Sequence, residues 1–390
     1  MDRRLHAVVL PPGPRLLAAL AAALDGTGPA ICPLSPDLPE PALRALLDVL
    51  APHAVETEAG TAPGPGEPAP VPDGTAVLIA TSGSTGTPKI VELSAAALAH
   101  SARGTLERVG AGRGERWLCC VPTSHISGVQ VLVRALVSGG EPLIHPRFDT
   151  GAVLAAASEA KGAHISLVPT QLRRLLDAGA DPSRFGAIIL GGAAAPPGLL
   201  AETRARGGRL HTTYGMSETC GGCVYDGVPL AGMRADVGAD GRIRLAGSSL
   251  FTGYRRRPDL TAAAMEGDWF VTQDLGALEA GGRLRVRGRA DDVINTGGEK
   301  VVAGEVAAAL ARHPKIRDVA VVGRPDPEWG ERVAAVVVPA ADTPGLGELR
   351  AFVRETLPAY AAPRELDLVD AIPLLPSGKP DLARLRSDQE

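Results

Sequence analysis

The sequence predicts an α/β fold with a large N-terminal domain and a small C-terminal domain. Up to about residue 240, apolar runs of strand length alternate with segments of helical apolar spacing. From Gly241 onward, polar and apolar residues alternate around Gly and Asp turns, and after Asp291 a compact unit with its own apolar positions follows. We therefore expect βαβ sheets, then a small antiparallel part, then an α+β C-terminal domain.

Short apolar runs predict the buried strands of the first part. The runs are AVLIA at 76–80, WLCCV at 117–121, HISLV at 164–168 and AIIL at 187–190, and helical spacing occurs at 94–106, 128–136 and 171–176. Helices between strands of this length are typical of a mostly parallel sheet. Residues 60–74 are rich in Pro and Gly, and we expect a linker or surface loop there.

The second part has a different texture. Runs at 242–245, 269–271 and 283–286 alternate in polarity, which predicts antiparallel strands with one face in water. In the C-terminal unit we expect a helix over 301–311, strands over 319–322 and 332–338, and a helix over 347–356. The expected domains are therefore 1–290 and 291–390.

Composition and charge limit the class of protein. Hydrophobic residues make up 45% and charged residues 22% of the 390-residue chain, which is typical of a soluble globular protein. The net charge of −4 excludes a generally basic nucleic-acid-binding surface. No stretch reaches the roughly 18 consecutive apolar residues of a membrane span.

The cysteines and the first apolar run predict the compartment. Five cysteines, an odd number, favour a reducing compartment over a disulfide framework. The run Leu16–Leu24 follows Pro11 and Pro12 and has no small-residue cleavage site after it, so we expect a buried helix rather than a signal peptide. We therefore expect a cytoplasmic protein.

The strongest chemical signal is the segment Thr81–Lys89 (TSGSTGTPK), which follows the AVLIA strand. Glycines let backbone amides approach a polyphosphate, hydroxyls add donors, and a lysine neutralises charge. A Walker A loop is excluded, because Pro88 precedes Lys89 and Ile90 follows it. The segment resembles the phosphate loop of the adenylate-forming superfamily of acyl-CoA synthetases, adenylation domains and luciferases. Its candidate ATP-binding residues are Thr81, Ser82, Gly83, Ser84, Thr85, Gly86 and Thr87.

Two further segments resemble the nucleotide and metal motifs of this superfamily. Gly191, Gly192 and Ala193 follow the AIIL strand and resemble the segment that lines the adenine. Tyr214–Thr219 (YGMSET) resembles the central motif, and the candidate residues are Tyr214 and Gly215 at the adenine, Glu218 for Mg²⁺ and Thr219 at the α-phosphate. An aromatic ring, a hydroxyl and a carboxylate within six residues suit a nucleotide–metal site.

The later motifs complete the resemblance. Residues 272–276 (TQDLG) resemble the ribose motif, with Asp274 on the ribose hydroxyls, and Gln273 stands where the family has glycine, so we expect strain there. Residues 288–294 resemble the hinge segment, which implies Arg289 at the ribose, Asp291 as the pivot and a mobile C-terminal domain. Gly297 and Gly298 resemble the loop that lets the thiol arm of CoA pass, and Lys379 in PSGK resembles the adenylation lysine.

The resemblance implies an acid–thiol ligase that uses ATP, Mg²⁺ and coenzyme A. The carboxylate of the acid attacks the α-phosphorus to give an acyl-adenylate, a step that needs charge neutralisation and in-line positioning. Lys89 would act on the β- and γ-phosphates, and Lys379 would bridge the acid and the α-phosphate. The expected partners are these small molecules, without nucleic acid or membrane span, and a homo-oligomer stays open.

Residues 122–128 (PTSHISG) point to the acid. This segment and residues 214–229 are similar to the o-succinylbenzoate–CoA ligases of menaquinone biosynthesis, in their compact actinobacterial form, which implies that His125, Ser127 and Gly128 lie beside the acid. The alternatives are a ligase for another aryl or acyl acid, or a stand-alone adenylation enzyme that loads a carrier protein. A nucleotide-binding regulator without catalysis is disfavoured, because the charged residues of every motif are present.

Two other motifs receive a structural interpretation. Cys220 and Cys223 are spaced like a zinc or redox pair, but no second pair of cysteines accompanies them, so we expect free structural thiols. Residues 255–257 (RRR) precede Pro258, and we expect a solvated turn.

Overall fold

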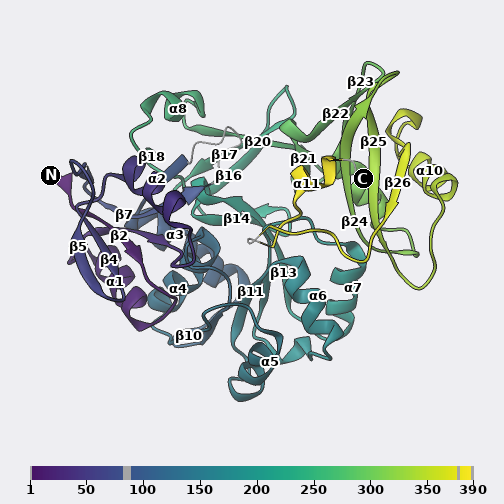
Figure 1. Cartoon of the computed structure of the whole chain (residues 1–390). Coiled ribbons are helices and arrows are strands. Elements are labelled where there is room, and N and C mark those ends of the chain that lie inside the picture. The colour runs from purple at the N-terminus through teal and green to yellow at the C-terminus, as the bar shows by residue number, and fades with distance from the viewer. Residues whose placement is uncertain (1, 82–88, 376–377, 388–390) are drawn as a thin grey trace.

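The computed structural model describes residues 2–81, 89–375 and 378–387. Its N-terminal part contains two large sheets and one smaller antiparallel sheet, and its C-terminal part has a sheet of its own (Figure 1). The predicted α/β class is confirmed. Ser84, like the other phosphate-loop residues of 82–88, lies outside the described residues.

The first large sheet is parallel at its centre and antiparallel at its edges. In spatial order its strands are β18 (Gly253–Tyr254), β8 (Lys89–Ser94), β7 (Thr75–Thr81), β3 (Ala30–Leu34), β2 (Leu5–Val9), β4 (Ala54–Thr57) and β5 (Gly60–Pro63). The helices of this region are α1 (Pro14–Asp25), α2 (Glu40–Leu50) and α3 (Ala95–Val109). The predicted AVLIA strand and the predicted Leu16–Leu24 helix are both present.

The loop predicted over residues 60–74 is partly wrong. It contains β5 and the short strand β6 (Val71–Pro72), which pairs with β1 (Asp2–Arg3). Strand β5 is exposed along its whole length and pairs on one side with β4. An edge strand tolerates Gly and Pro because one row of its backbone groups needs no partner in the sheet.

The second large sheet provides the platform for the site. In spatial order its strands are β10 (Pro142–Ile144), β9 (Trp117–Cys119), β11 (His164–Leu167), β12 (Ile188–Leu190), β13 (Leu210–Met216), β14 (Gly221–Tyr225) and β15 (Val228–Pro229). The first five are parallel, so their carboxyl ends share one edge. Its helices are α4 (Ile126–Ser138), α5 (Thr150–Glu159), α6 (Pro169–Asp177) and α7 (Pro197–Ala205), with a 3₁₀ turn at Pro182–Arg184.

The third sheet is antiparallel, as its alternating polarity predicted. Its strands are β16 (Met233–Val237), β17 (Arg242–Gly247), β20 (Trp269–Leu278), β19 (Met265–Glu266) and β21 (Leu284–Arg289), with α8 (Pro258–Ala263) before β19. It ends at the 3₁₀ turn Ala290–Asp292, where the C-terminal part begins.

The C-terminal part folds around its own core. Its strands are β23 (Glu299–Val302), β22 (Val293–Thr296), β25 (Gly330–Pro339), β24 (Ile316–Asp326) and β26 (Glu365–Leu368), and its helices are α9 (Ala303–Leu310), α10 (Leu346–Arg354) and α11 (Leu382–Arg386), with a 3₁₀ turn at Ala359–Ala361. The predicted helix 301–311 begins two residues later, because Val301 and Val302 pair with β22 instead. The hydrophobic clusters of this part contain only residues after Asp292.

The expected solvated turn at residues 255–257 is wrong for Arg255, which is 4% exposed. Its guanidinium donates to the carbonyls of Leu50 and Pro70, at 3.1 and 2.7 Å, and lies 3.4 Å from Glu92 Oε1. The carbonyl oxygen at the end of α2, that of Pro70 and a carboxylate replace water around this cation, and a buried guanidinium needs such partners.

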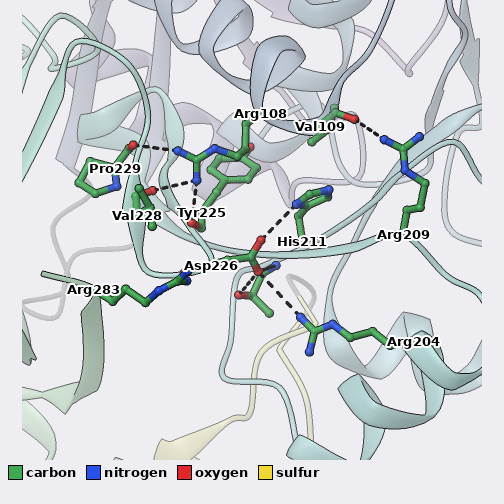
Figure 2. A network of polar contacts seen from close by, with 11 residues as sticks. Arg108, Val109, Arg204, Arg209, His211, Tyr225, Asp226, Val228, Pro229 and Arg283 are labelled. Atoms are coloured by element: carbon green, nitrogen blue, oxygen red, sulfur yellow. Dashed lines mark hydrogen bonds and ion pairs between the residues drawn. The ribbon is translucent and has the colours of Figure 1, made fainter. Parts of the chain in front are cut away.

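A network of hydrogen bonds and ion pairs lies at the start of β13, the end of the strand that is remote from the site (Figure 2). Asp226 has a left-handed backbone (φ 49°), and its carboxylate accepts from the backbone amide of Thr212 at 2.9 Å and lies 3.1 Å from His211 Nδ1. Arg283 of the third sheet donates to the Asp226 carbonyl at 2.7 Å. The network therefore ties the β14–β15 turn to β13 and to the neighbouring sheet.

The five cysteines are free and buried, and burial raises the pKa of Cys223 to about 12. In the part of the chain that is described, no helix is both long and apolar enough to span a membrane.

Candidate active site

The carboxyl edge of the second sheet gathers the predicted motifs. Residues 122–128 follow β9, Gly191 follows β12, and Tyr214 lies near the end of β13. Loops at the carboxyl ends of neighbouring parallel strands meet at one edge, which is the usual binding face of an α/β sheet. Motifs that are far apart in the sequence are therefore brought together by the topology.

One hydrogen bond and one ion pair join the predicted adenine and ribose residues. Tyr214 Oη donates to Asp274 Oδ2 at 2.7 Å, and Arg289 Nη1 lies 3.7 Å from Asp274 Oδ1. Asp274 and Arg289 face each other across β20 and β21, so the sheet register places them together. Burial and the neighbouring Asp274 raise the pKa of Tyr214, and the Tyr214 hydroxyl remains a donor.

The glycines of this edge are required by close packing. A Cβ on Gly191 would lie 2.7 Å from Thr213 Cγ2, and Gly192 has φ +82°. A Cβ on Gly215 would lie 2.0 Å from the Gly221 carbonyl, because β13 and β14 meet there at a bulge. Ala193 continues the loop that Gly191 and Gly192 begin.

The strain expected at Gln273 is absent. This residue is exposed in the middle of β20, and its φ is not among the positive values of the described non-glycine residues. An ordinary strand conformation accepts any side chain, so this position does not need the family's glycine.

Glu218 and Thr219 lie in the 3₁₀ turn between β13 and β14, and the role predicted for Thr219 does not fit. The Thr219 side chain is buried, and its hydroxyl accepts from the Met216 amide at 2.9 Å and donates to the Gly221 carbonyl at 2.7 Å. Those bonds shape the turn and leave no free surface for a phosphate. Ser217, partly exposed in the same turn, is the better placed hydroxyl.

Lys89 closes the phosphate loop at the start of β8. Thr81 and Lys89 face each other across β7 and β8, and Thr81 Oγ1 donates to the Lys89 carbonyl at 3.0 Å. The ammonium of Lys89 lies 5.6 Å from the ring centre of Tyr254, whose hydroxyl donates to Glu218 Oε1 at 2.8 Å. Lys89 and Glu218 both contact the side chain of Tyr254.

The sequence analysis missed Tyr254. No spacing rule connects residue 254 with residues 89 and 218, because the three lie on different elements and meet only through tertiary packing. In the sequence, Tyr254 is one of two aromatic residues in the segment 251–255 (FTGYR). That pattern does not by itself indicate a functional residue.

Lys379 lies on a small hairpin that crosses to the N-terminal part. The Leu375 amide donates to the Lys379 carbonyl at 2.8 Å, and Leu374 bridges Pro380. A Cβ on Gly378 would lie 2.9 Å from Val168 Cγ2, at the start of α6. Figure 1 shows this segment running from the C-terminal sheet back to the second sheet.

His125 precedes α4 and lies near Lys379. Loss of water contact, and then the positive charge of Lys379, lower the pKa of His125. Ser127 is exposed in the first turn of α4, and a Cβ on Gly128 would lie 2.4 Å from the Pro122 carbonyl. The predicted acid-binding segment and the predicted adenylation lysine therefore share one region of the structure.

The predicted hinge residue Asp291 lies where the C-terminal part begins, and the predicted glycine turn lies within that part. Asp291 accepts two hydrogen bonds from Arg289, at 2.7 and 2.6 Å, and these bonds lower its pKa. Gly297 and Gly298 form the β22–β23 turn with φ +61° and +85°, and a Cβ on Gly297 would lie 2.5 Å from Trp329. Figure 1 shows this hairpin apart from the Lys379 segment. The structure therefore does not bring the glycine turn to the carboxyl edge.

Among the described residues, no group of three or more His, Cys, Asp or Glu side chains is arranged to hold a metal. Glu218 offers a carboxylate beside Tyr254, whose ring lies near Lys89.

Comparisons with known proteins identify the family of the chain. The family model of the AMP-binding enzymes matches residues 51–245, and that of the AMP-binding enzyme C-terminal domain matches residues 305–379. A probable 2-succinylbenzoate–CoA ligase from Mycobacterium tuberculosis is 44% identical over 329 residues, which cover 81% of this chain and 85% of the relative. A feruloyl-CoA synthase from an Amycolatopsis species is 32% identical over 335 residues, with 79% and 68% covered.

Solved structures extend the likeness to the whole chain. The o-succinylbenzoate CoA synthetase of Bacillus subtilis, solved with its acyl-adenylate intermediate, superposes with a TM-score of 0.84 at 27% identity. The match covers 99% of this chain and 89% of that one. Together with the family models, these matches show that the chain belongs to the family of AMP-binding enzymes.

Proposed function

We propose that this protein is an ATP-dependent ligase that converts 2-succinylbenzoate to its acyl-adenylate and then to the CoA thioester. The observation that carries the proposal is that the Lys379 segment packs on the second sheet, where a Cβ on Gly378 would lie 2.9 Å from Val168 Cγ2, at the carboxyl edge that also carries Glu218 and Tyr214 with its bond to Asp274. The likeness to 2-succinylbenzoate–CoA ligases supports the choice of acid.

ATP would lie along the carboxyl edge. Gly191, Gly192 and Ala193 would line the adenine with Tyr214, and Asp274 would accept from the ribose hydroxyls. The hydrogen bond between Tyr214 and Asp274 aligns that carboxylate before the nucleotide arrives. Such preorganisation reduces the cost of binding.

Mg²⁺ fits the carboxylate of Glu218. Magnesium in nucleotide enzymes commonly takes one or two protein carboxylates and completes its shell with phosphate oxygens and water. Glu218 is held by Tyr254 through one oxygen, and a carboxylate has a second oxygen to offer. When bound, the metal would neutralise charge on the phosphates.

The first half-reaction requires two cations in different places. A carboxylate oxygen of the acid attacks the α-phosphorus, the bond to the bridging oxygen breaks, and pyrophosphate leaves with that electron pair. Lys89 would stabilise the leaving pyrophosphate, and Lys379 would bring the acid and the α-phosphate together against their mutual repulsion.

The second half-reaction requires a different arrangement. The thiol of CoA attacks the acyl carbon, AMP leaves, and the thiol proton goes to solvent. We propose domains 1–290 and 291–390, with Asp291 as the pivot, so that rotation removes Lys379 and presents Gly297 and Gly298 to the thiol arm. Buried free thiols and the use of ATP and CoA support a cytoplasmic location.

A substrate panel tests the proposal. We expect 2-succinylbenzoate to exceed benzoate, acetate and medium-chain fatty acids by at least about tenfold in kcat/KM, or about 1.4 kcal/mol in transition-state binding. His125→Ala should raise KM for the acid more than for ATP. Equal use of fatty acids would contradict the assignment of the acid.

The second candidate is a ligase for another aryl acid, which the likeness to feruloyl-CoA synthase favours. Ferulate belongs in the same panel for this reason. A higher kcat/KM for ferulate than for 2-succinylbenzoate would select this candidate and leave the ligase chemistry intact.

A further inference from the structure

A short segment, Phe251–Arg255, connects the two charged groups that would face the phosphates. Its backbone lies along β8, whose first residue is Lys89: Gly253 and Tyr254 pair with that strand, and the Arg255 amide donates to the Ile90 carbonyl at 2.8 Å. The other side of the segment contacts the 3₁₀ turn that carries Glu218.

Glu218 is held at both its backbone and its side chain by this segment. The Phe251 amide donates to the Glu218 carbonyl at 2.8 Å, and Tyr254 Oη donates to Glu218 Oε1 at the same distance. The carboxylate that would bind the metal therefore has a fixed position in the free protein, although its turn is short.

Tyr254 also touches the lysine of the phosphate loop. Its ring lies 5.6 Å from Lys89 Nζ, within the range of a cation–π contact, and only 9% of the residue is exposed. A tyrosine hydroxyl is protonated at neutral pH, and that of Tyr254 donates to Glu218. One side chain thus orients a carboxylate with its hydroxyl and a lysine with its ring.

The segment Phe251–Arg255 is itself held in place by contacts of Arg255 and Phe251. Arg255 is buried against the carbonyls of Leu50, at the end of α2, and Pro70. Phe251 packs edge-on to both Tyr254 and Phe270, with ring centres 4.9 and 5.3 Å apart. These contacts restrict the rotation of Tyr254, which a positioning role requires.

We propose that Tyr254 is a positioning residue that aligns Glu218 for Mg²⁺ and Lys89 for the β- and γ-phosphates. The proposal rests on the proposed function, since it assumes ATP and Mg²⁺ at this edge. In this proposal the hydroxyl of Tyr254 orients Glu218 and its ring orients Lys89. Different substitutions of Tyr254 remove the hydroxyl alone or the hydroxyl and the ring.

Calorimetric titration of ATP without any carboxylic acid tests it, because no turnover occurs. With Mg²⁺ present, Tyr254→Phe should raise the Kd of ATP about five- to tenfold, since the hydrogen bond to a charged group is lost. With EDTA instead of Mg²⁺, the same variant should change the Kd less than about twofold. Tyr254→Leu also removes the ring, and it should weaken ATP further under both conditions.

A double-mutant cycle makes the result specific to Glu218. In a Glu218→Gln background, Tyr254→Phe should change the Kd of ATP with Mg²⁺ less than about twofold, because the group it positions is gone. Phe270→Leu is the matched control: it disturbs the same aromatic cluster and should lower Tm, with no change in the ratio of the two Kd values.

Two results would overturn the proposal. One is a Kd with Mg²⁺ that is unchanged or lower in Tyr254→Phe, and the other is an equal loss in the Glu218→Gln background. Failure of the wild-type protein to bind ATP at all would instead contradict the proposed function, so the two failures are distinguishable.

Discussion

The two halves of the proposed site are held in different ways. The nucleotide side is built from strands: Tyr214, Asp274 and Arg289 lie on β13, β20 and β21, and a hydrogen bond and an ion pair join them. The lysine side lies on a separate segment of the C-terminal part: Lys379 is exposed, and its neighbour Gly378 packs on Val168, the residue before α6.

This difference indicates which half of the site keeps its position during the proposed reaction. Residues fixed by sheet register and burial keep their positions whatever the C-terminal part does. The Lys379 hairpin belongs to a unit with a separate core, so the domain rotation proposed above would leave the core of the larger part covered. The structure is thus suited to a reaction in which one cation is needed in the first step and removed in the second.

The largest expected effect comes from removing that cation. Lys379→Ala should slow acid-dependent ATP–pyrophosphate exchange about 10²- to 10³-fold, because a charge that acts on the transition state is lost. Tm should not change, since Lys379 is exposed. Lys315→Ala, which removes a lysine of the C-terminal part paired with Glu348 at 3.0 Å, is the matched control and should leave exchange intact. Equal losses of exchange activity in the two variants would contradict the separate role proposed for Lys379.

The hinge gives the next largest effect. Asp291→Pro fixes φ near −65° and removes a backbone donor, so we expect thioester formation to fall at least about tenfold while adenylation survives. Asp291→Ala is the control, because it also loses the bonds to Arg289 but keeps backbone freedom. If both half-reactions fall equally in the proline variant, or if alanine reproduces its effect, the pivot is not at this residue.

The smallest effect concerns stability at the far end of β13 (Figure 2). Burial alone would raise the pKa of Asp226, but hydrogen bonds from His211 and Thr212 outweigh it and lower the pKa to about 2. A lowered carboxylate pKa stabilises the fold above the unfolded value, near 3.9, and this stabilisation is lost as the pH falls toward the folded value.

Asp226→Asn should therefore lower the free energy of unfolding by about 1 to 2 kcal/mol near pH 6, after allowance for partial exposure. The difference from wild type should shrink as the pH falls from about 4 toward 2, and ATP binding should not change. Urea unfolding at several pH values measures this. A difference that is constant with pH would show that the carboxylate charge is not the cause.

Much of the fold was predictable from residue pattern alone. The strands at 76–80 and 187–190 and the helices at 94–106 and 347–356 are present, because each has a clear apolar period. The errors have tertiary causes. Residues 60–63 form a strand only because β4 offers an edge, and Val301 leaves its predicted helix to pair with Ile294.

The site was predictable where its residues sit in one contiguous motif. The YGMSET segment and Lys379 could be found in the sequence, although their roles remain proposals. The α-phosphate role predicted for Thr219 does not fit, because its hydroxyl forms hydrogen bonds within its own turn. No sequence pattern reveals those bonds. Tyr254 and Arg255 were missed or misread because their partners lie on distant segments.

The central claim is that Lys379 serves adenylation alone and withdraws before thioester formation. The most direct measurement supplies Lys379→Ala with preformed 2-succinylbenzoyl-adenylate and CoA and follows a single turnover. The account predicts thioester formation near the wild-type rate, although the same variant fails in pyrophosphate exchange. A loss in this step comparable to the loss in adenylation would contradict it.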